Sequence, residues 1–74
     1  NASAVPKLIE ILSDENEHVM VRHEAAEALG AIGDRSAIPV LEMFLYDALP
    51  EVAESCEVAL DLLALCDSTS DVQW

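Results

Sequence analysis

The chain has 74 residues and a formal net charge of −12, because three basic residues face fifteen acidic ones. Proteins bind nucleic acids and anionic lipids through lysine and arginine, so this balance excludes both as general partners and favours cationic ones. A hydrophobic fraction of 53% is too high for a disordered acidic tail. Asn1 rather than Met stands first, which is typical of a processed or excised segment.

The two cysteines give a prediction about the redox setting. Cys56 and Cys66 would lie ~15 Å apart if one helix carries both. A disulfide needs Cα atoms within about 7 Å, so we expect none within the chain. A reducing, cytoplasmic setting is therefore the expectation. No apolar run approaches the ~20 residues of a membrane-spanning helix.

An internal repeat organises the chain. Residues 3–8 (SAVPKL) return as residues 36–41 (SAIPVL), and the second half of each copy aligns after a shorter connector. Each copy is a little over thirty residues long, on the order of a helical-hairpin repeat. We predict one hairpin over residues 1–33, a second over residues 34–66, and a flexible tail over residues 67–74.

Capping residues and prolines set the predicted helices in chain order. The first runs over residues 3–13, with Ser3 as N-cap and Pro6 in the first turn. The second runs over residues 19–32 and ends at Gly33. The third begins with Ser36 and Pro39 in the same way as the first, and the fourth runs over residues 51–65.

Apolar residues recur at helical spacing on the second and fourth helices. Such a stripe is the face that a helix buries. Cys56 aligns with Ala25, so we interpret it as a core residue rather than a reactive thiol. Two repeats rarely make a stable solenoid, so we expect an open apolar flank that an upstream segment covers or that causes self-association. The predicted stripes are Val21, Ala25, Ala28, Leu29 and Ile32, and Val52, Cys56, Ala59, Leu60 and Leu63.

One residue pair suggests chemistry. At ~100° per residue, His23 points about 200° away from Val21, almost opposite the predicted stripe. Glu24 follows it, and Glu27 lies four residues on, within reach of the imidazole. The small residues Ala26 and Gly30 are expected to leave room beside this face.

The pair has two interpretations. It is either part of a solvated helix surface or a set of metal ligands, and a single pair cannot hold a metal tightly because such sites need at least three protein ligands. In the second copy Glu54 and Ser55 replace His23 and Glu24, so the repeat's fold does not require the pair. His18, in the preceding turn, is expected to be a surface residue.

Two segments resemble a known family. Residues 20–32 (MVRHEAAEALGAI) are similar to the metal-bearing repeat of deoxyhypusine hydroxylase, and residues 54–61 (ESCEVALD) resemble the segment that follows its last such repeat. The Ala-x-Pro-x-Leu signature between them resembles the family's HEAT-like repeats. The resemblance implies an all-α fold, with two HEAT-like helical hairpins (four helices) of an α-solenoid.

The resemblance also implies a function. In this family four His-Glu pairs from two halves hold a di-iron centre, which activates O₂ to hydroxylate the deoxyhypusine side chain of a translation factor. By position, His23 and Glu24 would be the last of the four pairs and thus metal ligands, with Glu27 a contact of the ligands or of the substrate amine. The other pairs would come from the N-terminal remainder of the parent chain, so the isolated chain is expected to be inactive.

Two alternatives stay open. The first is a metal-free HEAT-like interaction module whose acidic face binds a basic partner. The second is the related repeat family of phycobilin lyases, which has similar Ala- and Leu-rich repeats and no need of a His-Glu pair.

Overall fold

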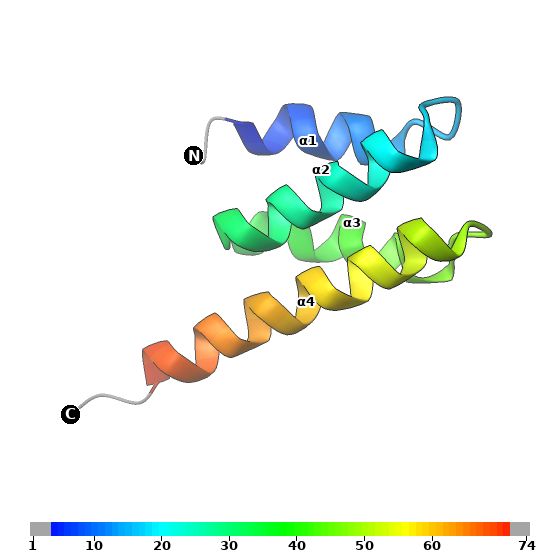
Figure 1. Cartoon of the computed structure of the whole chain (residues 1–74). Coiled ribbons are helices and arrows are strands. Elements are labelled where there is room, and N and C mark those ends of the chain that lie inside the picture. Colours follow the sequence, from blue (N-terminus) through cyan, green and yellow to red (C-terminus); the bar gives the residue numbers. More distant parts are fainter. Residues whose placement is uncertain (1–3, 72–74) are drawn as a thin grey trace.

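The computed structural model describes residues 4–71, and side chains as far as Leu65. Four α-helices form two successive hairpins (Figure 1), and the described part contains no strand. This arrangement confirms the predicted all-α class, and no described helix is long and apolar enough to cross a membrane. The elements are α1 (Val5–Ser13), α2 (Val19–Ile32), the 3₁₀ turn η2 (Arg35–Ala37), α3 (Ile38–Met43), the 3₁₀ turn η3 (Phe44–Tyr46) and α4 (Pro50–Asp71).

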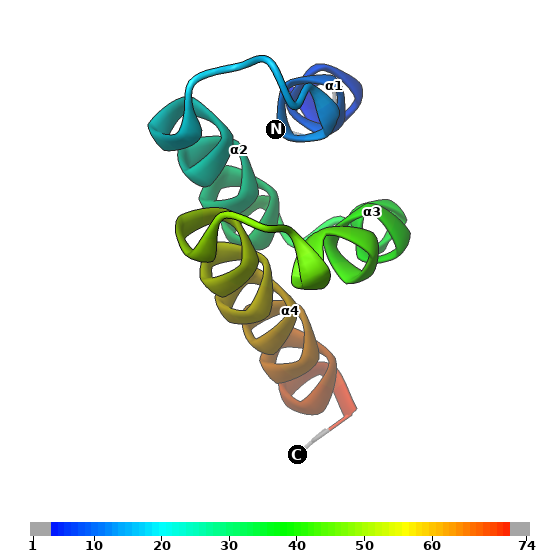
Figure 2. The ribbon, with the colours of Figure 1, turned by 90° about the vertical axis from the view of Figure 1, so that its right-hand side faces the viewer.

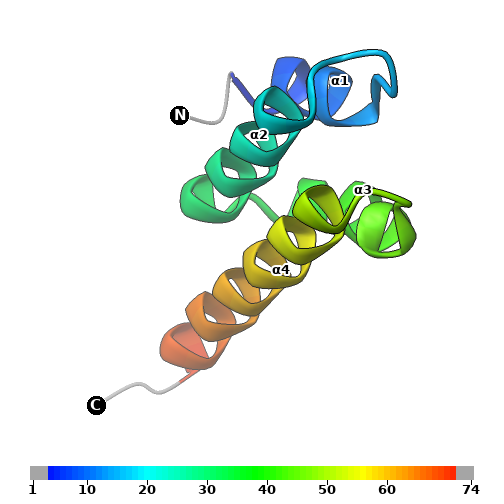
Figure 3. The same ribbon diagram turned by 45° about the vertical axis from the view of Figure 1, so that its right-hand side comes forward.

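The helices lie in two layers. Seen end-on, α1 and α3 form one layer and α2 and α4 the other (Figure 2). Figure 3 shows α2 and α4 side by side and running in the same direction. Since α2 packs against both α1 and α4, it is the central helix of the fold.

The ends of α2 agree with the predicted bounds, and their caps explain why. Gly33 adopts φ 77°, a left-handed conformation that glycine tolerates, and its N–H bonds to the Leu29 carbonyl. At the other end, the Nδ1 atom of His18 accepts a hydrogen bond of 3.1 Å from the Met20 N–H. His18 is exposed as expected, and it is also the N-cap of α2.

The predicted N-cap of the third helix is wrong, and the one predicted for the first helix is not tested. Ala4 takes the N-cap position of α1 with no side-chain cap, and Ser3 lies outside the described residues. Before η2 the cap is Asp34, whose carboxylate accepts a hydrogen bond of 2.9 Å from the Ser36 N–H. That hydrogen bond also lowers the pKa of Asp34. Asp34 and Ser36 are both good capping residues, so composition alone did not separate them.

The fourth helix is longer than predicted. It begins one residue early, at Pro50, where proline is tolerated because the first turn needs no N–H donor. It ends at Asp71, so residues 67–71, expected in a flexible tail, are helical.

The buried face of α2 is turned by about a quarter turn from the predicted stripe. Val21 is 39% exposed, while Arg22 is 1% exposed. The reason is that α2 buries the sides facing α1 and α4, and a stripe read from apolar residues alone misses small and charged residues on those sides. The buried residues of α2 are Arg22, Ala25, Ala26, Leu29 and Gly30.

On α4 the predicted stripe is almost wholly buried. Four of its five residues are buried and Leu60 is half-buried. Val52 is fully buried on α4, which packs against α2, α3 and η3, whereas its repeat equivalent Val21 is 39% exposed on α2, which packs mainly against α1 and α4. The side of α2 that carries Val21, with Ala28 and Ile32 half-buried beside it, is therefore a partly open apolar flank, as expected for a solenoid repeat.

Gly30 sets the distance between α2 and α4. A Cβ atom at this position would lie 2.8 Å from the Ala59 Cα and 2.9 Å from its Cβ. Gly30 and Ala26 are both buried, so the expectation that they leave room beside His23 is wrong. Gly30 instead lets the two helices approach closely.

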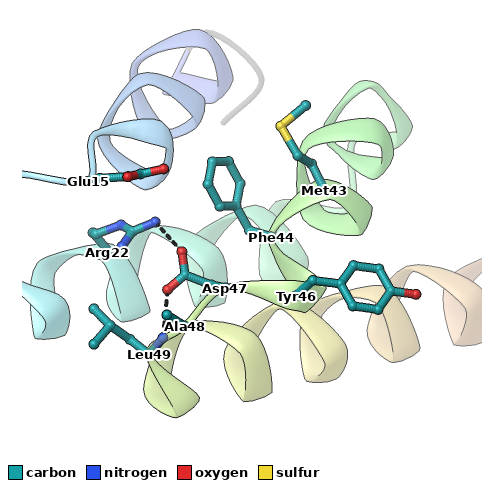
Figure 4. A pocket seen from close by; sticks show the side chains of 8 residues that line it. All are labelled: Glu15, Arg22, Met43, Phe44, Tyr46, Asp47, Ala48 and Leu49. Atoms are coloured by element: carbon teal, nitrogen blue, oxygen red, sulfur yellow. Dashed lines mark hydrogen bonds and ion pairs between the residues drawn. The ribbon is translucent and has the colours of Figure 1, made fainter.

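Arg22 joins three parts of the fold in the core. Its Nε donates a hydrogen bond of 2.9 Å to the Leu12 carbonyl at the end of α1. Its Nη2 donates one of 2.9 Å to Asp47 Oδ1, and its guanidinium lies 5.5 Å from the centre of the Phe44 ring. The second Asp47 oxygen accepts from the Leu49 N–H (Figure 4), so both carboxylate oxygens are bonded.

Burial and the contacts of Asp47 act on its pKa in opposite directions. Burial alone would raise it, but the hydrogen bond from Leu49 and the hydrogen bond and charge of Arg22 hold the pKa below its usual value. Because the folded-state pKa is depressed, the carboxylate stabilises the fold above its ordinary pKa and loses that effect as the pH falls through the folded-state value.

We predict that Arg22→Met destabilises the chain by about 3 kcal/mol, because it leaves the Asp47 carboxylate buried without its partner. The measurement is chemical unfolding followed by circular dichroism. Lys7→Met is the matched control, because the Lys7–Glu10 pair is 73% and 71% exposed and such pairs contribute ~0–1 kcal/mol.

The difference between wild type and Arg22→Met should shrink in strongly acidic solution, where Asp47 is protonated in both proteins. Equal stability of the two proteins at neutral pH would contradict the role given to Arg22.

We also predict that Gly30→Ala lowers stability, although alanine favours a helix over glycine by ~1 kcal/mol. The added methyl group would overlap the backbone of Ala59, which cannot move as a flexible side chain can. Thermal unfolding tests this prediction. The control is Ala31→Gly at the neighbouring exposed position, which measures the difference in helix propensity between alanine and glycine without the packing effect. A higher melting temperature for Gly30→Ala would show that the helices have room to spare.

Candidate functional site

His23 lies at the groove between α2 and α4. Its side chain is 29% exposed, and its Nε2 is 3.4 Å from Glu27 Oε2. Its Nδ1 is 3.4 Å from the Glu51 carbonyl oxygen, in the first turn of α4. The prediction that His23 points opposite the core is wrong, because the buried face is turned toward it and brings it beside Gly30, at the edge of the α2–α4 contact.

An open pocket of about 260 Å³ surrounds the imidazole. Its lining includes apolar and acidic residues, so the pocket offers both an apolar surface and negative charge. Both helices contribute, α2 with Met20, His23 and Glu27 and α4 with Glu51, Glu54, Ser55 and Val58.

Glu24 is exposed and is not part of this pocket wall. Adjacent residues on a helix diverge by ~100°, so Glu24 projects from the side of α2 away from α4. The carboxylate beside the His23 ring is that of Glu27. The described side chains thus bring His23 and Glu27 together and leave Glu24 directed toward the open flank.

The donor types at this site suit a metal, whereas their number does not. Imidazole and carboxylate are ligands of non-haem iron. A ligating histidine commonly donates its second ring N–H to a carbonyl, and the Glu51 carbonyl is placed to receive one from Nδ1, which would leave Nε2 as the metal donor. Among the described residues, no group of three histidine, cysteine or acidic side chains could hold an ion. The pair therefore fits iron only with ligands from elsewhere.

Neither Cys56 nor Ser55 has the features of a nucleophile. Cys56 is fully buried, and burial together with the nearby Asp47 charge raises its pKa to about 11, against a smaller opposing effect of Arg22. This confirms its interpretation as a core residue. The Ser55 hydroxyl is buried too and donates a hydrogen bond of 2.9 Å to the Val52 carbonyl.

A second pocket, of about 440 Å³, lies where the hairpin turns meet (Figure 4). The Arg22–Asp47 pair is part of its wall, and Met43 and Tyr46 stand exposed at its rim. Sequence reasoning missed Arg22, and the signal that could have found it is a lone arginine among the small residues of α2, at the position where the second copy has Ala53.

Comparison with known proteins places this architecture. The family profile described as HEAT repeats matches residues 1–61. The chain belongs to the HEAT-repeat family.

Curated relatives carry a more specific name. Deoxyhypusine hydroxylase of Candida albicans is 55% identical over 84% of this chain and 20% of its own length. The Schizosaccharomyces pombe protein of that name is 52% identical over 97% of this chain. The human one is 47% identical over 81% of it. The chain thus spans about a fifth of the length of these relatives.

A solved structure agrees with this homology. The structure of human deoxyhypusine hydroxylase in complex with glycerol superposes with a TM-score of 0.92 at 41% identity. The match covers 95% of this chain and 24% of the human one. The two hairpins therefore have the geometry of one segment of that larger helical protein.

We predict that the chain on its own binds divalent metal only weakly. His23 and one neighbouring carboxylate are fewer than the three ligands that tight sites need. Titration with Co²⁺, followed by its visible absorption, should show no stoichiometric binding, and His23→Ala should change little. A tight complex with one ion per chain would contradict the ligand count.

Proposed function

We propose that this chain is the part of a deoxyhypusine hydroxylase that supplies one His-Glu pair, His23 and Glu24, to a di-iron centre. The enzyme would be a cytoplasmic monooxygenase that hydroxylates the deoxyhypusine side chain of a translation factor and so completes hypusine. The observation that carries the proposal is 47–55% identity to curated deoxyhypusine hydroxylases over more than four-fifths of the chain.

In this proposal each residue of the pair has a separate task. His23 binds metal through Nε2 while the Glu51 carbonyl, 3.4 Å from Nδ1, fixes the ring. Glu24 binds the metal with its carboxylate. Because the two side chains leave α2 in directions ~100° apart, the metal centre would have to lie between these two directions, beside the helix. Iron, when bound, supplies the oxygen chemistry.

The pocket walls suit a long side chain that ends in amines. Met20 and Val58 would contact its methylene groups, and both are about half exposed, at 47% and 56%. The Glu27 and Glu54 carboxylates would attract its ammonium groups. Glu27 is near enough to His23 to contact either the ligand or the substrate amine.

The missing ligands would come from the rest of a longer chain. The open flank of α2 at Val21, Ala28 and Ile32 corresponds to the side of α4 that α2 itself covers. We propose that an upstream helical hairpin covers it in the same way, which places further repeats beside Glu24. The isolated chain, with one pair, would be inactive.

A metal-free interaction module is the second candidate. It is favoured by the acidic residues Glu27, Glu51 and Glu54 that line the groove between α2 and α4. Its acidic groove would then bind a basic partner without chemistry.

The test uses the complete open reading frame that encodes these residues. Its product should bind iron and hydroxylate a protein carrying deoxyhypusine, and His23→Ala and Glu24→Ala should each lose iron and turnover. His18→Ala is the matched control: it removes an exposed imidazole and costs ~1 kcal/mol of capping, but should keep iron and activity.

Full iron content and activity in His23→Ala would remove the site assignment. A product without iron that still binds a basic protein would favour the interaction module.

A further inference from the structure

The side of α4 that borders the groove with α2 carries a line of exposed apolar residues. Val58, Leu62 and Leu65 are 56%, 40% and 63% exposed. They recur at positions i, i+4 and i+7, so they fall within about 60° of one another on one helix face. We call these three residues the α4 stripe.

The fold of the repeat does not require the stripe to be apolar. The equivalent positions of the first copy hold Glu27, Ala31 and Asp34, and that hairpin is formed without large apolar residues there. Core packing on α4 instead uses the adjoining face, with Val52, Cys56, Ala59 and Leu63. An exposed apolar line that packing does not explain is typical of a contact surface.

The stripe is continuous with the candidate site. Val58 is part of the pocket wall around His23, and Leu62 and Leu65 follow it along α4. Helix α4 extends past the end of α2 (Figure 1), so the stripe leads out of the groove. From Val58 to Leu65 it covers ~10 Å at ~1.5 Å per residue, about the length of three extended residues.

The charge beside the stripe selects the kind of partner. Glu54, Glu57 and Asp61 are exposed on the adjoining face of α4. No lysine or arginine follows Arg35 in the sequence, and the chain carries −12 overall. A second copy of the chain would bring like charges together, whereas a basic segment with interspersed apolar side chains would match both surfaces.

From these observations we propose that the α4 stripe docks the polypeptide next to the modified residue of the substrate protein. This inference rests on the proposed function. The segment of about three residues that leaves the pocket would place apolar side chains on Leu62 and Leu65, and its lysine or arginine side chains against Glu57 and Asp61. The stripe then recognises the protein substrate, separately from the side chain that enters the pocket.

The test again uses the complete gene product, with a protein substrate. The double variant Leu62→Ser/Leu65→Ser should raise KM by about tenfold, with kcat and iron content unchanged, because only the docking contact is lost. Met43→Ser/Tyr46→Ser is the matched control: those side chains are 67% and 88% exposed but lie at the other pocket, and KM should not change.

Charge reversal tests the second half of the inference. Glu57→Lys/Asp61→Lys should also raise KM and should weaken its dependence on salt concentration.

Two results would overturn the proposal. One is an unchanged KM in the stripe variant. The other is a loss of iron or of thermal stability, or of a dimer, in place of the KM effect, since the stripe would then be covered by the rest of the chain or by a second copy. A wild-type product with neither iron nor turnover is a different result and refutes the proposed function itself.

Discussion

The fold depends on one buried guanidinium. Arg22 is 1% exposed and reaches the end of α1, the Phe44 ring and the Asp47 carboxylate. A charge in this position is tolerated only because its partners are hydrogen-bonded in turn, and no buried side-chain polar atom in the described part lacks a partner. Arg22 thereby fixes the turn before α4 against α2, which sets how the second hairpin sits on the first. A hydrophobic contact would supply similar burial without this directional constraint.

A second constraint is the close approach of α2 and α4, which leaves the groove beside their contact. Gly30 lets the helix axes come close at Ala59, and farther toward the N-terminal end of α2 the helices leave an open pocket around His23. The Glu51 carbonyl can meet the imidazole only because the first turn of α4 lies there. The position of the candidate ligand is thus a consequence of inter-repeat packing rather than of α2 alone.

Sequence reasoning found the repeat and the core role of Cys56, because both depend on the spacing of residues along the chain. It also found the bounds of α2, because Gly33 ends that helix. It placed the buried face of α2 about a quarter turn away, since Val21 and Ile32 are apolar and yet belong to an open flank, while Arg22 and Gly30 are not typical core residues. The error carried over to the site: the residue opposite the core is Glu24, and His23 is at the edge of the contact. Periodicity gives the width of an apolar face, but which neighbours cover it is a tertiary property.

The two copies of the repeat share one helical-hairpin architecture and differ at the positions that line the groove between α2 and α4. In the first copy the groove-lining side of α2 presents His23 and Glu27, and in the second copy the equivalent positions are Glu54 and Val58. Because α2 and α4 run side by side in the same direction, these different surfaces adjoin in one groove, where the imidazole of α2 and acidic residues of both helices lie beside Met20 and Val58. A single repeat could not offer both, since one helix position would have to be both histidine and glutamate, as at His23 and Glu54, and another both glutamate and valine, as at Glu27 and Val58. Differences between two copies of one hairpin therefore give this short segment a groove whose two walls carry different side chains.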